Sequence, residues 1–103
     1  MLRVTPPRSP VPRDVSIELE RVVERWRQLP LDRALLYAGR VRALVQSLAD
    51  GVAEASGIPA TTVPDCGPAT LMDQLTVMVY DASVADLTSR LAGDLANLRR
   101  ELV

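Results

Sequence analysis

The chain has 103 residues, 48% apolar and 24% charged, with a formal net charge of −1, one cysteine and no histidine. This length indicates one domain with enough apolar material for a core, and a charge near zero disfavours a protein that coats nucleic acid or membranes. The absence of histidine excludes Ser-His and Cys-His nucleophilic pairs and metal sites built on histidine. We therefore expect a non-enzymatic protein without catalytic, cofactor-binding or metal-binding residues.

Composition also indicates an origin and a compartment. All 12 basic residues are arginine and phenylalanine is absent, which is typical of a GC-rich, bacterial gene. A single cysteine cannot form an internal disulfide, as in a reducing cytoplasm. Neither a signal-peptide core nor a stretch of roughly 20 apolar residues is present. The expected location is cytoplasmic, with no membrane partner.

Proline and arginine recur through residues 1–13, which predicts an extended or disordered arm. Residues 14–103 are expected to form a single helical domain. Its first helix is predicted over residues 15–29, because apolar residues recur there at steps of four and three. These residues are Val15, Leu19, Val22, Trp26 and Leu29.

A second helix is predicted over residues 33–56, with Asp32 as a cap. It is apolar on more than one face, so we expect neighbours on two of its sides. Gly51 is a weak point, where a break in the helix would be tolerated.

A connection rich in proline and glycine follows, and a third helix is predicted over residues 68–82, where Gly67 and Pro68 suit a helix entry. The β-branched run over residues 75–80 leaves a strand as an alternative. No second strand-like segment exists to pair with it, so helix is favoured.

A fourth helix is predicted over residues 84–102. Ser83 and Asp86 have the spacing of a capping box, and a narrow row of leucines follows at steps of three and four. The predicted fold is therefore all-α, either a four-helix bundle or two packed helical hairpins.

Charges on the second helix oppose its dipole, because arginines occupy its first half and acids its second half. If the first two helices form a hairpin, Glu20 approaches Arg40 and Glu18 approaches Arg42. If the helix instead pairs with a second copy about Gln46, Arg42 faces Asp50 of the other copy, as a two-fold interface requires.

This pattern predicts a homodimer, and the function we expect is a protein–protein interaction, scaffold or regulatory module of unassigned pathway. The interface candidates are Arg40, Arg42, Val45, Asp50 and Glu54.

The alternative is a small-molecule-binding helical bundle with a pocket near Cys66, Met72 and Met78. For these three residues, core packing is the favoured interpretation. A nucleic-acid-binding regulator is less favoured, because the second helix is too apolar to lie against phosphates.

Overall fold

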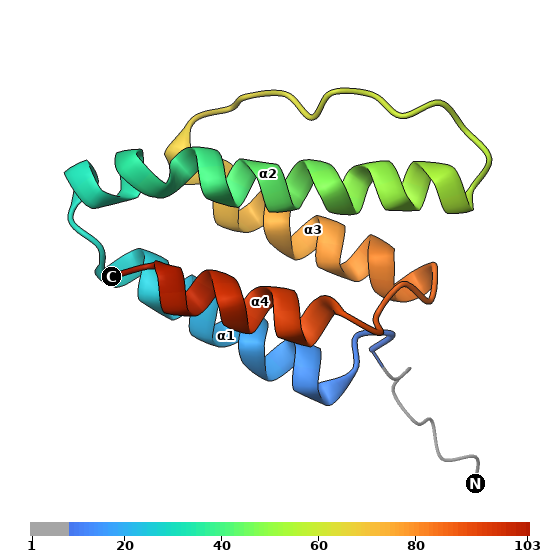
Figure 1. Ribbon diagram of the computed structural model, residues 1–103, viewed down its shortest axis with the longest axis horizontal. Coiled ribbons are helices and arrows are strands. Elements are labelled where there is room, and N and C mark those ends of the chain that lie inside the picture. The colour runs from blue at the N-terminus through green and yellow to red at the C-terminus, as the bar shows by residue number, and fades with distance from the viewer. Residues whose placement is uncertain (1–8) are drawn as a thin grey trace, which may run out of the picture.

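The computed structural model describes residues 9–103, which contain four α-helices and one short 3-10 helix (Figure 1). In chain order they are α1 (Arg13–Gln28), α2 (Leu31–Ala55), the 3-10 helix η1 (Pro68–Thr70), α3 (Leu71–Val84) and α4 (Leu91–Glu101). Over residues 9–103 there is no strand, which confirms the all-α prediction. None of the helices in this range is long and apolar enough to cross a bilayer.

The arm predicted over residues 1–13 falls largely on residues 1–8, which lie outside the described part of the chain. Its last residue, Arg13, is already the first residue of α1. The helix starts earlier than predicted because Pro12 fits the position before it: the carbonyl of Pro12 accepts a hydrogen bond from the amide of Ser16 at 2.9 Å.

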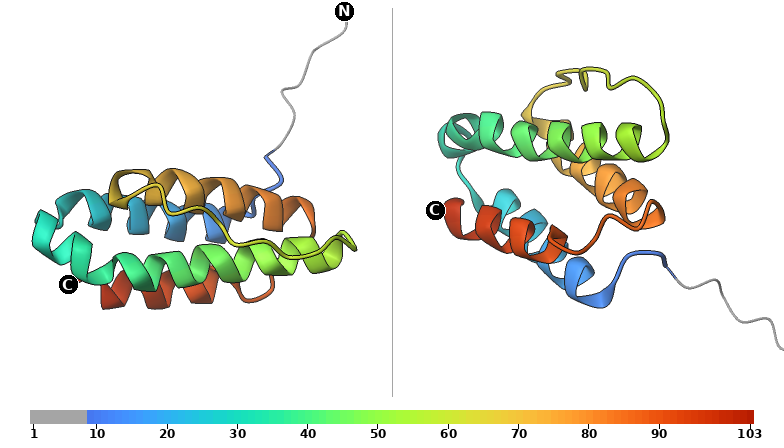
Figure 2. Two further views of the ribbon diagram at one scale, coloured as in Figure 1. Left: turned by 90° about the horizontal axis from the view of Figure 1, so that it is seen from above. Right: turned by 45° about the vertical axis from the view of Figure 1, so that its right-hand side comes forward.

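The four helices form a bundle with one long crossover (Figures 1 and 2). α1 and α4 run in one direction, and α2 and α3 run in the opposite direction, since the connection between α2 and α3 carries the chain back along α2. α1 packs mainly against α4, and α2 packs mainly against α3. Neither pair is an antiparallel hairpin: α2 and α3 are consecutive helices but run parallel, and α1 packs mainly against α4 and not against α2. The arrangement is therefore closer to the predicted bundle than to two packed hairpins.

Leucine and valine from all four helices make the core. The largest fully buried side chains, exposed by 2% or less, are Val15, Val22, Val41, Val45, Leu71, Leu75, Val79, Leu91, Leu95, Leu98 and Leu102. Trp26 and Tyr37 are only partly buried and pack against this cluster. Burial of each such aliphatic side chain contributes about 1.5–3 kcal/mol, so the bundle is held by many similar contacts and not by an aromatic centre.

α2 is continuous through Gly51, so no break occurs there. A Cβ at this position would lie 3.7 Å from Leu87 Cδ1, so the glycine lies where the connection after α3 passes close to α2. The helix ends in a Schellman motif: Gly57 has φ +68°, and the amide of Ile58 donates to the carbonyl of Ala53 at 3.0 Å.

α3 begins at Leu71, three residues later than predicted, because Pro68 starts η1. Gly67 has φ +88°, a left-handed conformation that glycine adopts without strain. Residues 75–80 are helical, so the strand alternative is wrong.

The prediction of a fourth helix from residue 84 is also wrong. α3 extends to Val84, and α4 begins only at Leu91. Ser83 and Asp86 are not a capping box: the hydroxyl of Ser83 donates to the carbonyl of Val79 at 2.7 Å inside α3. Asp86 has φ +62° and ends α3 in a second Schellman motif, in which the amide of Leu87 donates to the carbonyl of Ala82 at 2.8 Å.

Candidate interaction surfaces

The interface candidates on α2 already make contacts within the chain. Arg40 Nε lies 2.6 Å from Glu101 Oε2, and Arg42 Nη1 lies 2.8 Å from Asp65 Oδ2. Val45 is 1% exposed and belongs to the core of the single chain. The expected hairpin pairs of Arg40 with Glu20 and of Arg42 with Glu18 are therefore wrong, because α4 and the α2–α3 connection supply the partners instead.

The acids of α2 differ from each other. Asp50 Oδ1 accepts a hydrogen bond from Gln46 Nε2 at 2.7 Å, whereas Glu54 is exposed near the end of the helix. Gln46 in turn binds the α2–α3 connection, as described below. A contact between two copies centred on Gln46 would require this connection to move first.

Glu18 joins α1 to α4. Its Oε2 lies 3.2 Å from Arg99 Nε, and its Oε1 lies 3.1 Å from Arg21 Nη1. The Glu18 side chain is 16% exposed and that of Arg99 is 28% exposed, which makes this the most sheltered ion pair among the described residues. It forms because α1 packs against α4 and not against α2.

Residues 58–67, here called the strap, run back along α2 without regular secondary structure (Figure 1). Their side chains are exposed except for Val63 and Gly67, which are partly buried. Gln46 and Arg42 of α2 and Gln74 of α3 bind the strap through hydrogen bonds. The strap is thus attached to the bundle surface by polar contacts and one apolar side chain.

The pocket candidates do not come together in one site. Met72 is 9% exposed and belongs to the core. Met78 is partly buried and lines an apolar hollow of about 230 Å³ beside Val45, Val63 and Val77. Cys66 is exposed on the strap and does not line this hollow.

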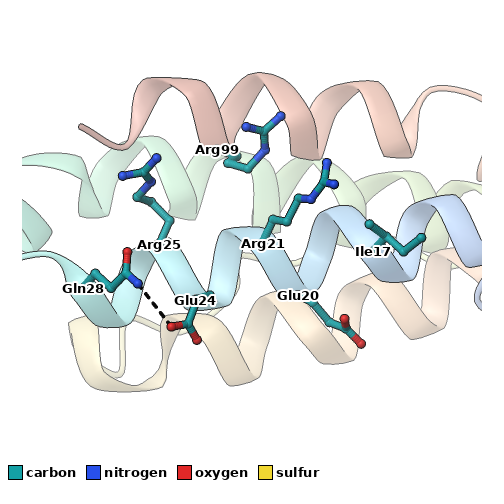
Figure 3. A pocket seen from close by; sticks show the side chains of 7 residues that line it. All are labelled: Ile17, Glu20, Arg21, Glu24, Arg25, Gln28 and Arg99. Atoms are coloured by element: carbon teal, nitrogen blue, oxygen red, sulfur yellow. Dashed lines mark hydrogen bonds between the residues drawn. The ribbon is translucent and has the colours of Figure 1, made fainter.

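A groove of about 600 Å³ lies along α1 beside α4 (Figure 3). It is lined by Ile17, Glu20, Arg21, Glu24, Arg25, Gln28 and Arg99. Figure 3 shows the three arginines directed to one side and the two glutamates to the other. Two of the arginines bind Glu18, so opposite charges offset each other and the groove resembles an ordinary solvated surface.

Residues 9–103 contain no group of three or more His, Cys, Asp or Glu side chains arranged to hold a metal ion. The one polar side chain buried in this range is Ser83, whose hydroxyl bonds the α3 backbone.

A row of exposed apolar side chains runs along α3, on the side opposite the core. Val77, Tyr80 and Val84, here called the α3 stripe, are 54%, 50% and 62% exposed and follow one another at steps of three and four, so they share one face. The row was not predicted from the sequence, in part because Val84 was placed in the fourth helix. The signal was present: α3 is apolar on two opposite faces.

A second exposed apolar group lies in the first turns of α2. Leu31, Leu35 and Leu36 are 69%, 56% and 68% exposed. These turns extend beyond the start of α3 (Figure 1), and although Ala34 is buried there, the three leucines are exposed. Sequence analysis expected neighbours on two sides of this helix, and the first two turns lack the second one.

The chain matches no protein-family model, no curated protein and no solved structure.

Proposed function

We propose that this chain is a non-enzymatic protein-interaction module that forms a homodimer through the α3 stripe. The observation that carries the proposal is the exposure of Val77, Tyr80 and Val84, each about half or more, on one face of a helix whose other face is in the core. Contiguous apolar side chains on a surface mark interaction sites more often than scattered ones do, and an aromatic residue at the centre is typical of an interface anchor.

A two-fold axis near Tyr80 would make the contact self-complementary. Two antiparallel α3 helices centred between residues 80 and 81 place Val77 of one copy opposite Val84 of the other, and bring the two tyrosine rings together. Asp81 is on the edge of this contact, so its carboxylate would approach the same carboxylate of the other copy. Such like-charge contact weakens the dimer, and added salt should screen it.

Sedimentation velocity tests the proposal. We expect a monomer–dimer equilibrium at micromolar to millimolar concentration that becomes tighter as the salt concentration rises. Tyr80→Ser should weaken dimerisation by roughly tenfold or more, the effect of removing an interface anchor. Leu36→Ser is the matched control, because Leu36 is also an exposed large apolar residue, at 68%, but lies on α2. A wild-type chain that stays monomeric throughout the range, or equal effects of both substitutions, would refute the proposal.

The small-molecule alternative has less support. The apolar hollow next to Met78 has a volume of about 230 Å³, whereas ligand pockets in proteins usually measure about 300–1,000 Å³. Two of the three residues expected to form the pocket, Cys66 and Met72, do not line it.

A further inference from the structure

The strap is bound much as an extended peptide would be bound. Gln46 contacts its main chain twice: Oε1 accepts a hydrogen bond from the amide of Val63 at 2.8 Å, and Nε2 donates to the carbonyl of Thr61 at 3.0 Å. Gln74 Nε2 donates to the carbonyl of Pro64 at 3.0 Å. Bonds of this type depend on an extended backbone and not on side-chain identity, and they provide affinity in peptide recognition.

Side chains of the strap add selectivity. Val63 is partly buried and packs against the core, and it lines two hollows of about 280 and 230 Å³, the second of which is shared with Val77 and Met78. Valine therefore does not fill the site, and a larger aliphatic residue would bury more surface there. Two residues later, Asp65 forms the ion pair with Arg42. The site thus recognises an apolar residue and, two positions later, an acid, whereas Pro64 between them is exposed and is bound only through its carbonyl.

The binding face extends beyond the strap. The strap runs antiparallel to α2, because Val63 contacts Gln46 and Asp65 contacts Arg42. Leu35 and Leu31 lie on the same face, seven and eleven residues before Arg42, or about 10 and 16 Å along the axis. The strap does not reach them, because the chain turns into η1 after Gly67.

We propose that this face of α2 binds an extended segment of a partner protein in place of the strap. The segment carries an aliphatic residue, proline and an acid, followed by aliphatic residues about three and five positions after the acid. These spacings match the distances to Leu35 and Leu31 at about 3.3 Å per extended residue. The strap competes with the partner at a high effective concentration, because it is tethered to the same chain. The partner segment can displace it because the segment also contacts Leu35 and Leu31. The inference rests on the proposal that the chain binds protein, but it uses a face of α2 that shares only Val77 with the α3 stripe.

A fluorescently labelled peptide of sequence ATTVPDSGLGL, titrated with the full-length chain and followed by anisotropy, tests this proposal. We expect saturable binding, and binding at least about tenfold weaker for the peptide ATTVPDSGSGS, which lacks both leucines. A peptide with leucine in place of its valine should bind more tightly. Absence of binding at millimolar protein, or equal binding of the first two peptides, would overturn the proposal.

Three variants separate this site from non-specific adhesion, and each changes a side chain that is exposed or only partly buried. Leu35→Ser should weaken binding about tenfold, whereas Val63→Ser should tighten it severalfold because it loosens only the competing strap. Leu36→Ser, on another face of α2, should change nothing. If Val63→Ser fails to tighten binding, or if Leu36→Ser matches Leu35→Ser, the assignment is wrong. Sedimentation of the same samples reports on the α3 stripe separately, so failure of dimerisation and failure of peptide binding are distinguishable.

Discussion

Replacing Asp86 by glycine and by alanine tests how α3 ends. Asp86 has φ +62°, a left-handed conformation that costs an L-residue about 1–2 kcal/mol and costs aspartate somewhat less. Glycine removes this cost but increases the entropy of the unfolded chain by about 0.4–1 kcal/mol. We expect Asp86→Gly to leave stability unchanged or raise it by up to about 1 kcal/mol. Asp86→Ala should lower it, which places the glycine variant about 1 kcal/mol above the alanine variant.

The order of the two variants distinguishes the observed turn from the predicted helix start. If a helix began at residue 84, Asp86 would lie in its first turn, and alanine would be more stable than glycine by about 1 kcal/mol. Urea unfolding followed by circular dichroism at 222 nm measures the difference. With a slope of about 1 kcal/mol per molar urea, the glycine midpoint should lie about 1 M above the alanine midpoint.

Gly57→Ala is the control for this measurement. Gly57 has φ +68°, and a Cβ there would meet no atom within 4 Å. The stability lost on substitution by alanine therefore reports the backbone conformation alone. We expect a loss of about 1 kcal/mol. If alanine is as stable as glycine at position 86 while Gly57→Ala shows the expected loss, Asp86 does not adopt the left-handed conformation and α3 does not end as described.

Two further outcomes follow from burial. Leu95 is 0% exposed, so Leu95→Ala should destabilise the chain by about 2–5 kcal/mol in urea unfolding. The control, Leu36→Ala, should change the stability by no more than about 0.5 kcal/mol. Similar losses for both variants would contradict the assignment of α4 to the core. Cys66 is exposed, so a thiol reagent should modify one thiol per chain without denaturant, and modification only on unfolding would contradict the placement of the strap.

The α3 stripe and the strap give the two proposals different positions on the same bundle. The stripe faces away from the core on α3, whereas the strap runs along α2 (Figure 2) and is bound by Gln46 of α2 and Gln74 of α3. Val77 belongs to the stripe and also lines the hollow beside Val63. Dimerisation and peptide binding are therefore expected to influence each other where the two surfaces meet.

The positions of α1 and α2 could be predicted from the sequence because the information is local. Val15 and Val22 recur at helical spacing, and both are buried as expected. Pro30 separates α1 from α2, as proline disfavours continuation of a helix. For the same reason Gly67 and Pro68 correctly marked the entry to η1 and α3. Apolar periodicity and helix-breaking residues act within a few residues of the chain, so both can be recognised in the sequence without knowledge of the fold.

The tertiary structure alone decided which helices pack together and which charges pair. Arg40 finds Glu101 and Glu18 finds Arg99, partners 61 and 81 residues away in the chain, because α4 lies beside α1 and near the first half of α2. The turn at Asp86 was ambiguous for a related reason: a short polar residue suits the end of one helix as well as the start of the next. The sequence pattern of a helix shows which of its faces is apolar. The neighbour that covers that face is set by contacts between segments that are distant in the sequence. Where no neighbour packs against an apolar face, as on the α3 stripe, the face stays exposed.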